Sequence, residues 1–368
     1  MLNALRLRNF RCYKTLNWQI PAEGALLLGS NAQGKTSLLE AICFALTLHS
    51  PRAGKLDRLV THGCEEFGIS LSTDEGTRKL LWQQRKLNTQ VDGIPRRDFN
   101  EYLADAPPVV WLSNTDISIV TGGAEERRNY LDFVGSQWHP AYRSALREYR
   151  KTLKSRNMLL RNPRHTAATL RSYAELLSRY GEILLTLRRQ LLDLLQPYIR
   201  RYHSNISVKG ENVSVTYRPS VEGNLQSAYE QALPADERNG FTTIGPHRDD
   251  FELHINGVPA AEYASEGQQR TLATSLILAQ AGLLQVETGR APTLLIDDIF
   301  GELDPSRRKA LLNSLPEDSQ IFITTTHLDW LGSDRVPLPL LNIDNGSISE
   351  LTSSGEPANR PPQRPSHP

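Results

Sequence analysis

Residues 29–36 read Gly29-Ser30-Asn31-Ala32-Gln33-Gly34-Lys35-Thr36 and fit the pattern GxxxxGK[ST] without a mismatch. An apolar run of strand length precedes this phosphate loop, and a stretch of helical character follows it. In a strand–loop–helix unit, the N–H groups of the loop and the positive end of the helix dipole bind phosphate. We expect Lys35 to neutralise the β- and γ-phosphates and Thr36 to ligate Mg²⁺. The stretch therefore predicts an ATP site formed by all eight residues, in an α/β fold.

A second apolar strand, Leu294-Leu295-Ile296, ends in the paired carboxylates Asp297 and Asp298. In a protein with a phosphate loop, Asp297 is expected to hold Mg²⁺, directly or through water. Asp298 is expected to orient or deprotonate the water that attacks the γ-phosphate. Two acids at a strand end also commonly cap a helix, so this pair indicates catalysis only in combination with the phosphate loop.

The segment Ser265-Glu266-Gly267-Gln268 stands at the start of a predicted helix, Gln269 to about Glu287. A serine hydroxyl and a helix N-terminus together offer donors to an anion. Simple capping by Ser265 is the alternative. Its place, some thirty residues before the aspartate pair, resembles the signature of ABC ATPases. There Ser265, Gly267 and Gln268 would contact an ATP that is held by another subunit.

Two shorter segments resemble further ABC elements. Glu302-Leu303-Asp304, just after the aspartate pair, matches the D-loop that crosses the same interface. His327 follows a polar threonine run at the end of a strand and matches the switch histidine that senses the γ-phosphate. A lone histidine is more often structural, so this interpretation depends on its position.

The middle of the chain has a different pattern. Apolar residues recur at spacings of 4, 3, 4 and 7 from Tyr142 to Leu160, and at alternating spacings of three and four from Leu170 to Tyr198, with a break at Asn162-Pro163-Arg164. The second run continues for about four heptads, which favours a coiled-coil seam and predicts an antiparallel helical hairpin. The alternative is a helical subdomain of a globular core.

Charge is unevenly distributed along the chain. The overall net charge is +1, but residues 125–201 contain sixteen Lys and Arg against seven Asp and Glu. Such a run is usually a solvated face, but a cluster within three helical turns predicts contacts to a phosphate backbone, and so to DNA. This cluster consists of Arg143, Arg147, Arg150, Lys151 and Lys154.

Composition excludes several classes of protein. No run of about 18 apolar residues predicts a membrane span, and the first residues lack the apolar block of a secretory signal. The three cysteines show no CxxC spacing, and their odd number argues against a disulfide framework or a cysteine metal site. We therefore expect a cytoplasmic protein without a membrane partner.

These motifs together resemble the RecF family, within the SMC and Rad50-like ABC ATPases, along nearly the whole chain up to the tail. The run that is most specific to the family is Gly245-Pro246-His247-Arg248-Asp249-Asp250, because SMC and Rad50 heads share the other motifs. The remaining matches are Asn9-Phe10-Arg11, the phosphate loop, Leu38 to Ile42, Glu126-Arg127-Arg128 through Leu131-Asp132, Ser265 to Thr271, and Leu295 to Asp304.

The resemblance implies a two-lobed ATPase head with a short helical arm, and a homodimer that forms with ATP. It also implies binding to duplex or gapped DNA and cooperation with RecO and RecR in loading RecA. The chain departs from the family pattern at Ala32, where glycine is usual, and at Glu266, where Gln or Gly is usual. Ser113-Asn114-Thr115-Asp116 replaces a proline-containing loop. The Q-loop glutamine is unassigned, with Gln83, Gln84 and Gln90 as candidates.

We predict an α/β fold, an ABC-type ATPase head assembled from both ends of the chain with an inserted helical arm. The expected domains are residues 1–124 and 206–352 for the head, 125–205 for the arm and 353–368 for a disordered tail. The expected function is a DNA-repair clamp with weak ATPase activity. Alternatives are a transport ATPase subunit, an SMC-like tether, and a dimer in which hydrolysis is vestigial.

Overall fold

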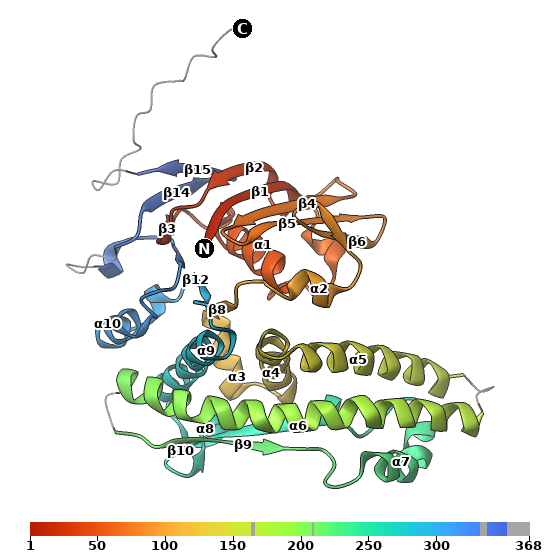
Figure 1. The fold of residues 1–368 in the computed structure, drawn as a ribbon. Coiled ribbons are helices and arrows are strands. Elements are labelled where there is room, and N and C mark those ends of the chain that lie inside the picture. Colours follow the sequence, from red (N-terminus) through yellow and green to blue (C-terminus); the bar gives the residue numbers. More distant parts are fainter. Residues whose placement is uncertain (163–165, 208–209, 332–336, 352–368) are drawn as a thin grey trace. The chain divides into compact units, whose positions relative to one another are not determined.

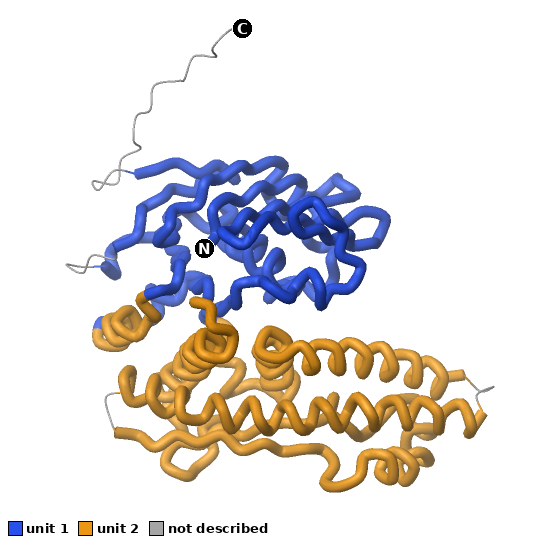
Figure 2. Tube along the Cα trace, in the orientation of Figure 1, with its two compact units in different colours: residues 1–114, 292–305, 318–368 blue, residues 115–291, 306–317 orange. Residues whose placement is uncertain are grey.

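The computed structural model describes residues 1–162, 166–207, 210–331 and 337–351. The chain forms two compact units (Figure 2). Unit 1 comprises residues 1–114, 292–305 and the described part of 318–368, and unit 2 comprises residues 115–291 and 306–317. Unit 1 thus draws on both ends of the sequence.

Unit 1 contains a mainly parallel sheet that carries the phosphate loop (Figure 1). Its strand order is β15-β14-β3-β13-β12-β8, and only β15 runs antiparallel to its neighbour. The central strands are continuous apolar runs, as expected for strands that are buried on both faces. The strands are β3 (Gly24–Leu28), β8 (Val109–Ser113), β12 (Thr293–Asp297), β13 (Ile321–Thr325), β14 (Leu340–Asp344) and β15 (Ser347–Glu350).

A second sheet in unit 1 is antiparallel, in the order β2-β1-β4-β5-β6-β7. Its strands are β1 (Leu2–Phe10), β2 (Tyr13–Gln19), β4 (Phe67–Thr73), β5 (Gly76–Gln83), β6 (Lys86–Val91) and β7 (Ile94–Arg96). Side chains alternate along β1, so that Leu5 and Leu7 are buried while Arg6 and Arg8 are exposed. The buried helix α1 (Lys35–Thr47) contacts strands of both sheets and forms the core between them. The short elements are η1 (Leu56–Leu59), α2 (Phe99–Leu103), η4 (Phe300–Glu302) and η5 (Asp329–Leu331).

Two long helices in unit 2, α5 (Pro140–Leu160) and α6 (Ala167–Ile206), pack side by side as the predicted hairpin (Figure 1). Pro163 and Arg164 of the predicted break lie outside the described residues. The buried stripe of α6 is wider than a two-position seam, because Ala174, Ser178 and Leu185 are buried as well as the heptad leucines. A stripe of this width is typical of a helix in a globular core.

The helix pair is not a free-standing arm, because it shares a core with other parts of unit 2. Tyr142 and Tyr149 of α5, Leu184 of α6, and Leu225 and Tyr229 of α7 belong to one buried cluster. Helix α6 also packs against α9 and β9. The coiled-coil expectation is therefore replaced by its alternative, a helical part of a globular unit.

The remaining elements of unit 2 are short, apart from a few helices. They are η2 (Asn114–Ile117), which begins at the last residue of unit 1, α3 (Ser118–Thr121), α4 (Ala124–Trp138), β9 (Val213–Arg218), α7 (Leu225–Asn239), η3 (Pro246–Arg248), β10 (Asp250–Ile255), β11 (Val258–Pro259), α8 (Ala260–Tyr263), α9 (Glu266–Thr288) and α10 (Pro305–Ser314). Helix α9 begins three residues before the predicted start.

The predicted domain boundaries stay a prediction. Residues 206–291, assigned to the head, belong to unit 2 together with the helix pair. A head with two lobes would also divide in this way. The division therefore does not decide whether residues 206–291 belong to the head or form one domain with the helix pair. The predicted tail, residues 353–368, lies outside the described residues. Within the described ranges, none of the helices is long and apolar enough to cross a membrane.

Candidate functional site

The phosphate loop lies at the carboxyl end of β3, and α1 begins at Lys35 as the sequence predicts. The Lys35 ammonium donates hydrogen bonds to the carbonyl oxygens of Gly29 at 2.6 Å and Ser30 at 2.9 Å. Burial lowers the pKa of Lys35, and the charges of Asp298 and Asp297 act in the opposite direction. The ammonium is thus held within the loop, beside the two acids.

Two glycines of the loop are required by close approaches. A Cβ at Gly29 would lie 2.4 Å from the carbonyl oxygen of Ile343 in β14. Gly34 has φ of 111°, and a Cβ there would lie 2.8 Å from both the Tyr13 hydroxyl and the Cys12 sulfur. Ala32 also adopts a left-handed backbone, with φ of 65°. A residue with a Cβ is strained there, which explains why glycine suits this position.

Asp297 connects the loop to the neighbouring strands. Its Oδ1 accepts hydrogen bonds from the hydroxyls of Thr36 at 2.8 Å and Thr324 at 2.7 Å. Burial raises the pKa of this carboxyl, and the two hydroxyl donors lower it. A carboxylate next to a threonine hydroxyl is an oxygen-rich pair of the kind that Mg²⁺ prefers. The structure thus brings together the two predicted metal ligands, which are 261 positions apart in the sequence.

Asp298 has a left-handed backbone, with φ of 50°. Both main-chain polar groups of Asp298 form hydrogen bonds with side chains. Its N–H donates to the Thr324 hydroxyl at 3.0 Å, and its carbonyl accepts from the Asn114 side-chain amide at 2.8 Å. The strain is therefore compensated by specific contacts, as is common at functional sites.

His327 also lies in unit 1, and its ring is half exposed. A Cβ placed on Gly301 would lie 3.8 Å from its Nε2, so the ring lies next to the segment that follows the aspartate pair. In the D-loop segment, Leu303 is buried, whereas Glu302 and Asp304 are exposed. The phosphate loop, both aspartates, the D-loop segment and His327 all belong to unit 1.

The signature segment belongs to unit 2. Ser265 caps α9: its hydroxyl accepts from the Gln268 N–H, and its own N–H donates to the Gln268 side chain. The capping alternative is thus present. It does not exclude the anion-binding interpretation, because a hydroxyl that accepts one bond can still donate another. The Glu266 carboxylate accepts from Arg270 one turn further along the helix at 2.9 Å, which partly balances its charge.

Gly267 has a neighbour that sequence reasoning missed. A Cβ on this glycine would lie 2.7 Å from a guanidinium nitrogen of Arg307, in α10. Gly267 does not have a positive φ, so the nearby guanidinium, which would have to shift to admit a side chain here, is the feature that favours glycine. No local pattern in the sequence indicates this contact, because forty residues separate the partners.

The basic cluster on α5 is partly occupied by internal contacts. Arg143 donates to the Ser136 carbonyl, Arg147 pairs with Glu148, and Arg150 pairs with Asp132. Among the described residues, Lys151 and Lys154 have no ion-pair partner. The stripe is therefore weaker as a phosphate-binding surface than its sequence suggests.

Comparisons with known proteins agree with this geometry. A family model described as the RecF/RecN/SMC N terminal domain matches residues 1–336. DNA replication and repair protein RecF of Synechococcus sp. (strain JA-3-3Ab) is 35% identical, over 96% of this chain and 98% of the relative. The chain belongs to the RecF family. RecF of Gloeobacter violaceus (strain ATCC 29082 / PCC 7421) is 33% identical, over 94% of this chain and 98% of its own.

Solved structures confirm the fold of the ABC-type head. A structure of the recombination mediator protein RecF with ATP, from the RecFOR pathway, matches with a TM-score of 0.85 and 30% identity, over 95% of this chain and 97% of the other. An SMC head bound to a domain of ScpA matches with a TM-score of 0.55 at 15% identity, which shows the fold alone. The predicted membership of the SMC and Rad50-like ABC ATPases is confirmed.

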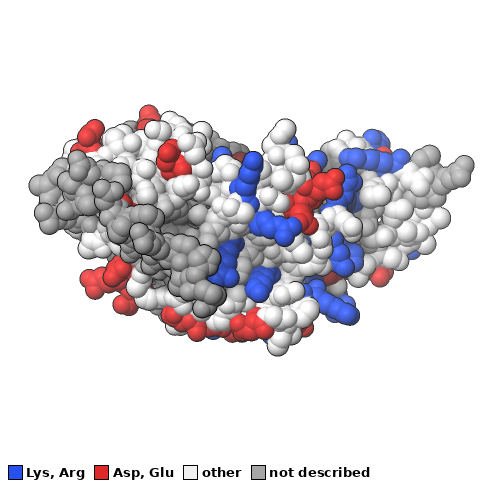
Figure 3. Space-filling model, turned by 90° about the horizontal axis from the view of Figure 1, so that it is seen from above, with Lys and Arg blue, Asp and Glu red and all other residues white. Residues whose placement is uncertain are grey.

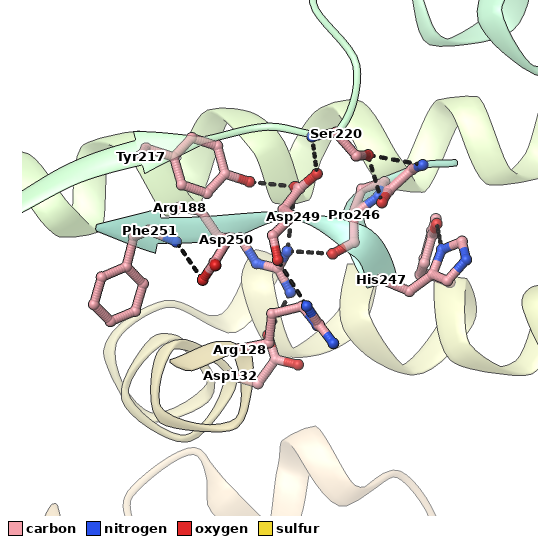
Figure 4. Close-up of polar contacts among 12 residues, drawn as sticks. Arg128, Asp132, Arg188, Tyr217, Ser220, Pro246, His247, Asp249, Asp250 and Phe251 are labelled. Carbon is pink, nitrogen blue, oxygen red and sulfur yellow. Dashed lines mark hydrogen bonds and ion pairs between the residues drawn. The ribbon is translucent and has the colours of Figure 1, made fainter. Parts of the chain in front are cut away.

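In the run most specific to the RecF family, residues 245–250, Pro246 and Asp249 contact a buried arginine in unit 2 (Figure 4). Arg188 donates to the Pro246 carbonyl at 2.6 Å and to Asp132 at 2.9 Å, and it pairs with Asp249 at 3.4 Å. Tyr217 donates a further hydrogen bond to Asp249. A buried charge without partners costs several kcal/mol. Asp132 and Asp249 are therefore needed to compensate the buried charge of Arg188. The run therefore stabilises unit 2, and no nucleotide role is required to explain it.

His247 belongs to the same run and is neutral at physiological pH. Its Nδ1 lies 2.8 Å from the Tyr149 hydroxyl, and its Nε2 lies 3.0 Å from the Thr242 carbonyl. A carbonyl can only accept, so Nε2 carries the proton and Nδ1 accepts from the tyrosine. Burial lowers the pKa of His247 from 6.5 to about 4.

The Q-loop candidates all lie in the antiparallel sheet. Gln84 and Arg85 form the two-residue turn between β5 and β6, both with positive φ, and Gln83 pairs with Lys86 beside it. Gln90 lies in β6. The structure adds no contact between these glutamines and the phosphate loop, so their assignment stays open.

Replacing Ala32 with glycine tests the strain in the phosphate loop. We expect Ala32→Gly to stabilise unit 1 by up to about 1 kcal/mol, because relief of the left-handed strain exceeds the entropy that glycine adds to the unfolded chain. The measurement is the free energy of unfolding in denaturant. Ala45→Gly, within α1, is the matched control and should destabilise by about 1 kcal/mol. If both variants lost the same free energy of unfolding, the backbone of Ala32 would not be strained.

Acid should destabilise unit 2 through His247. Between pH 6.5 and 4 the unfolded chain binds a proton that the folded chain does not, so stability rises with pH in this window and is lost as pH falls. The expected loss from this residue is about 3 kcal/mol over the window. His247→Gln should flatten that part of the pH profile of unfolding, whereas His62→Gln at an exposed position should not. An unchanged profile in His247→Gln would assign the acid sensitivity to other groups.

Proposed function

We propose that this protein is an ATP-switched DNA-binding mediator of DNA repair and recombination, which acts as a homodimer that closes on ATP. The observation that carries the proposal is the contact between Thr36 of the phosphate loop and Asp297 at the end of β12. This contact joins a hydroxyl and a carboxylate, which we assign as the two Mg²⁺ ligands of a phosphoryl-transfer site. Relatives named DNA replication and repair protein RecF, and a relative solved with ATP, support it.

The residues fit ATP and Mg²⁺. Asp297 is buried among hydroxyls, with its pKa raised by burial, so a cation beside it would offset the desolvation of its charge. When bound, Mg²⁺ would be held by Asp297 and Thr36, and it would neutralise charge on the phosphates. Lys35 would bind the β- and γ-phosphates, since its ammonium already lies inside the loop. Asp298 would orient or deprotonate the attacking water, and His327 would contact the γ-phosphate.

Two copies are required because the signature acts in trans. Ser265, Gly267 and Gln268, at the N-terminus of α9, would bind the γ-phosphate of an ATP that is held by the other copy. Glu266 does not prevent this, because Arg270 pairs with its carboxylate. The D-loop residues Glu302, Leu303 and Asp304 would cross the same interface. Hydrolysis would be weak and would reset the dimer, and a purely adhesive role for ATP is the alternative.

Replacing Ser265 with arginine should separate ATP binding from dimerisation. The large cation would occupy the signature surface, so ATP should still bind to the monomer but the dimer should not form. Sedimentation with ATP, with binding of a fluorescent ATP analogue measured in parallel, checks both properties. Lys35→Met is the matched control and should lose ATP binding and dimerisation together. If Ser265→Arg also lost ATP binding as a monomer, the in-trans assignment would fail.

DNA has two candidate surfaces in this protein. One is the basic cluster on α5, in which Arg147, Lys151 and Lys154 are all exposed. The other is the outer face of the antiparallel sheet, a groove lined by residues of β1, β4, β5, β6 and β7. Figure 3 shows Lys and Arg side chains across the middle and the right of the face drawn, with some Asp and Glu side chains among them. The cationic residues that line the groove are Arg6, Arg8, Lys79, Arg85, Lys86, Arg96 and Arg97.

The groove has the stronger charge pattern for a phosphate backbone. None of the described residues that line it is acidic, although Arg8 pairs with Glu66 nearby. Sheet alternation explains the pattern: β1 points Arg6 and Arg8 outward and Leu5 and Leu7 into the core. Phosphate contacts of this kind bind DNA irrespective of sequence.

Salt dependence distinguishes the two surfaces. Replacing Arg6, Lys79 and Lys86 with glutamine should weaken binding to a short duplex and make the log–log salt slope shallower by about 0.9 for each phosphate that is no longer neutralised. The matched variant on α5 replaces Arg147, Lys151 and Lys154 and should have a smaller effect, because Arg147 already pairs with Glu148. Fluorescence anisotropy with ATP, at several salt concentrations, measures both. A change confined to the α5 variant would assign DNA to the helix stripe.

The remaining parts of the proposal come from the family. Cooperation with RecO and RecR, and loading of RecA at gaps, are the roles that a RecF relative would share. A cytoplasmic location also stays a prediction. The alternative of a transport ATPase subunit requires a membrane partner, and the family match argues against it. An SMC-like tether requires much longer arms than α5 and α6, which span 21 and 40 residues.

A further inference from the structure

Asn114 is a residue that none of the ATP-binding motifs includes, yet it contacts Asp298 of the proposed ATP site. It follows β8 directly, and β8 pairs in parallel with β12 so that Ser113 is level with Asp297. Asn114 is therefore level with Asp298, at the carboxyl edge of the sheet. Ligands of open parallel sheets bind at this edge.

The Asn114 side chain makes one hydrogen bond and leaves one atom unsatisfied. Its Nδ2 donates to the Asp298 carbonyl oxygen at 2.8 Å. Its Oδ1 is buried, and within the described ranges no protein group donates to it. The amide cannot be reversed without facing two carbonyl-type oxygens toward each other, so the position of Oδ1 is determined by the contact to Asp298.

A buried acceptor without a donor is costly, typically by about 1–3 kcal/mol. It is retained most readily where a ligand or an ordered water supplies the donor. No such cost would arise with an apolar residue of the same shape at position 114. The unsatisfied Oδ1 of Asn114 therefore indicates that a hydrogen-bond donor is bound there together with the ligand, next to Asp298.

We propose that Asn114 positions Asp298 and binds a water at the γ-phosphate end of the ATP site. Its Nδ2 stabilises the left-handed backbone of Asp298 and thereby aims the carboxylate. Its Oδ1 accepts a hydrogen bond from a water that is bound together with Mg²⁺ and ATP. The proposal rests on the proposed ATPase function and adds to it a polar group beside the base.

Two variants separate the donor from the acceptor. Asn114→Leu has nearly the same shape and loses both groups. Asn114→Asp keeps the acceptor oxygen and loses the N–H donor to Asp298. Asn239→Leu is the matched control, because the Asn239 amide also donates to a main-chain carbonyl, that of Ala235, but at an exposed position. Asn114→Ala replaces the leucine variant if thermal unfolding shows that the latter does not fold.

The decisive measurement is the affinity for ATPγS, a slowly hydrolysed analogue, with Mg²⁺ and with EDTA. In Asn114→Leu we expect affinity in EDTA to be unchanged and the gain on adding Mg²⁺ to fall about tenfold, the effect of removing one hydrogen bond. Asn114→Asp should keep that gain. Single-turnover hydrolysis of ATP should fall about 10²-fold in both variants, since the base is misplaced in each.

Three outcomes would overturn the proposal: an unchanged Mg²⁺ gain in Asn114→Leu, an equal loss of affinity in EDTA and in Mg²⁺, or an effect as large in Asn239→Leu. A failure of the ATPase function itself would look different. The unaltered protein would then show no Mg²⁺-dependent gain at all, whatever stands at position 114.

Discussion

The two hydrogen bonds that Asp297 accepts tie β12 to the phosphate-loop helix and to β13, and the geometry of the site depends on them. Thr36 donates from the first turn of α1, and Thr324 donates from the end of β13. They require β12, β13 and β3 to lie in parallel register, so that three strands end at one edge of the sheet. The parallel pairing of β8 with β12 in turn aligns Asn114 with Asp298. A buried carboxylate is costly without a compensating charge, and burial accordingly raises the pKa of Asp297.

Local patterns predicted the parts of this site that local chemistry determines. The glycines at 29 and 34, the lysine, the threonine and the aspartate pair were found because their spacing follows from a strand, a tight loop and a helix. The strain at Ala32 could not be found in this way, because it depends on the φ angle. Nor could Arg307 or the Asn114 amide, whose partners are distant in sequence and are brought near only by packing.

For the helix pair α5 and α6, the sequence pattern was detected but did not determine how the helices pack. Its apolar spacing of three and four was detected correctly, but spacing alone does not distinguish a seam from a wider stripe. Ser178 and Gly181 look neutral in the sequence and are buried in the structure. Arg188 reads as one more positive charge, yet it is fully buried among Asp132, Asp249 and Tyr142. Charge counted by segment therefore overstated the basic surface of this region.

The interleaving of the chain in unit 1 has a consequence for synthesis on the ribosome. The central strands β12 and β13 begin at residues 293 and 321, whereas β3, which lies next to β13, ends at residue 28. Within the first 114 residues, β3 and β8 therefore lack their strand partners β13 and β12 until most of the chain has been translated. Unit 2 is nearly complete at residue 291 and can fold earlier. Because unpaired apolar strands aggregate readily, β3 and β8 are exposed to aggregation until β12 and β13 have been made.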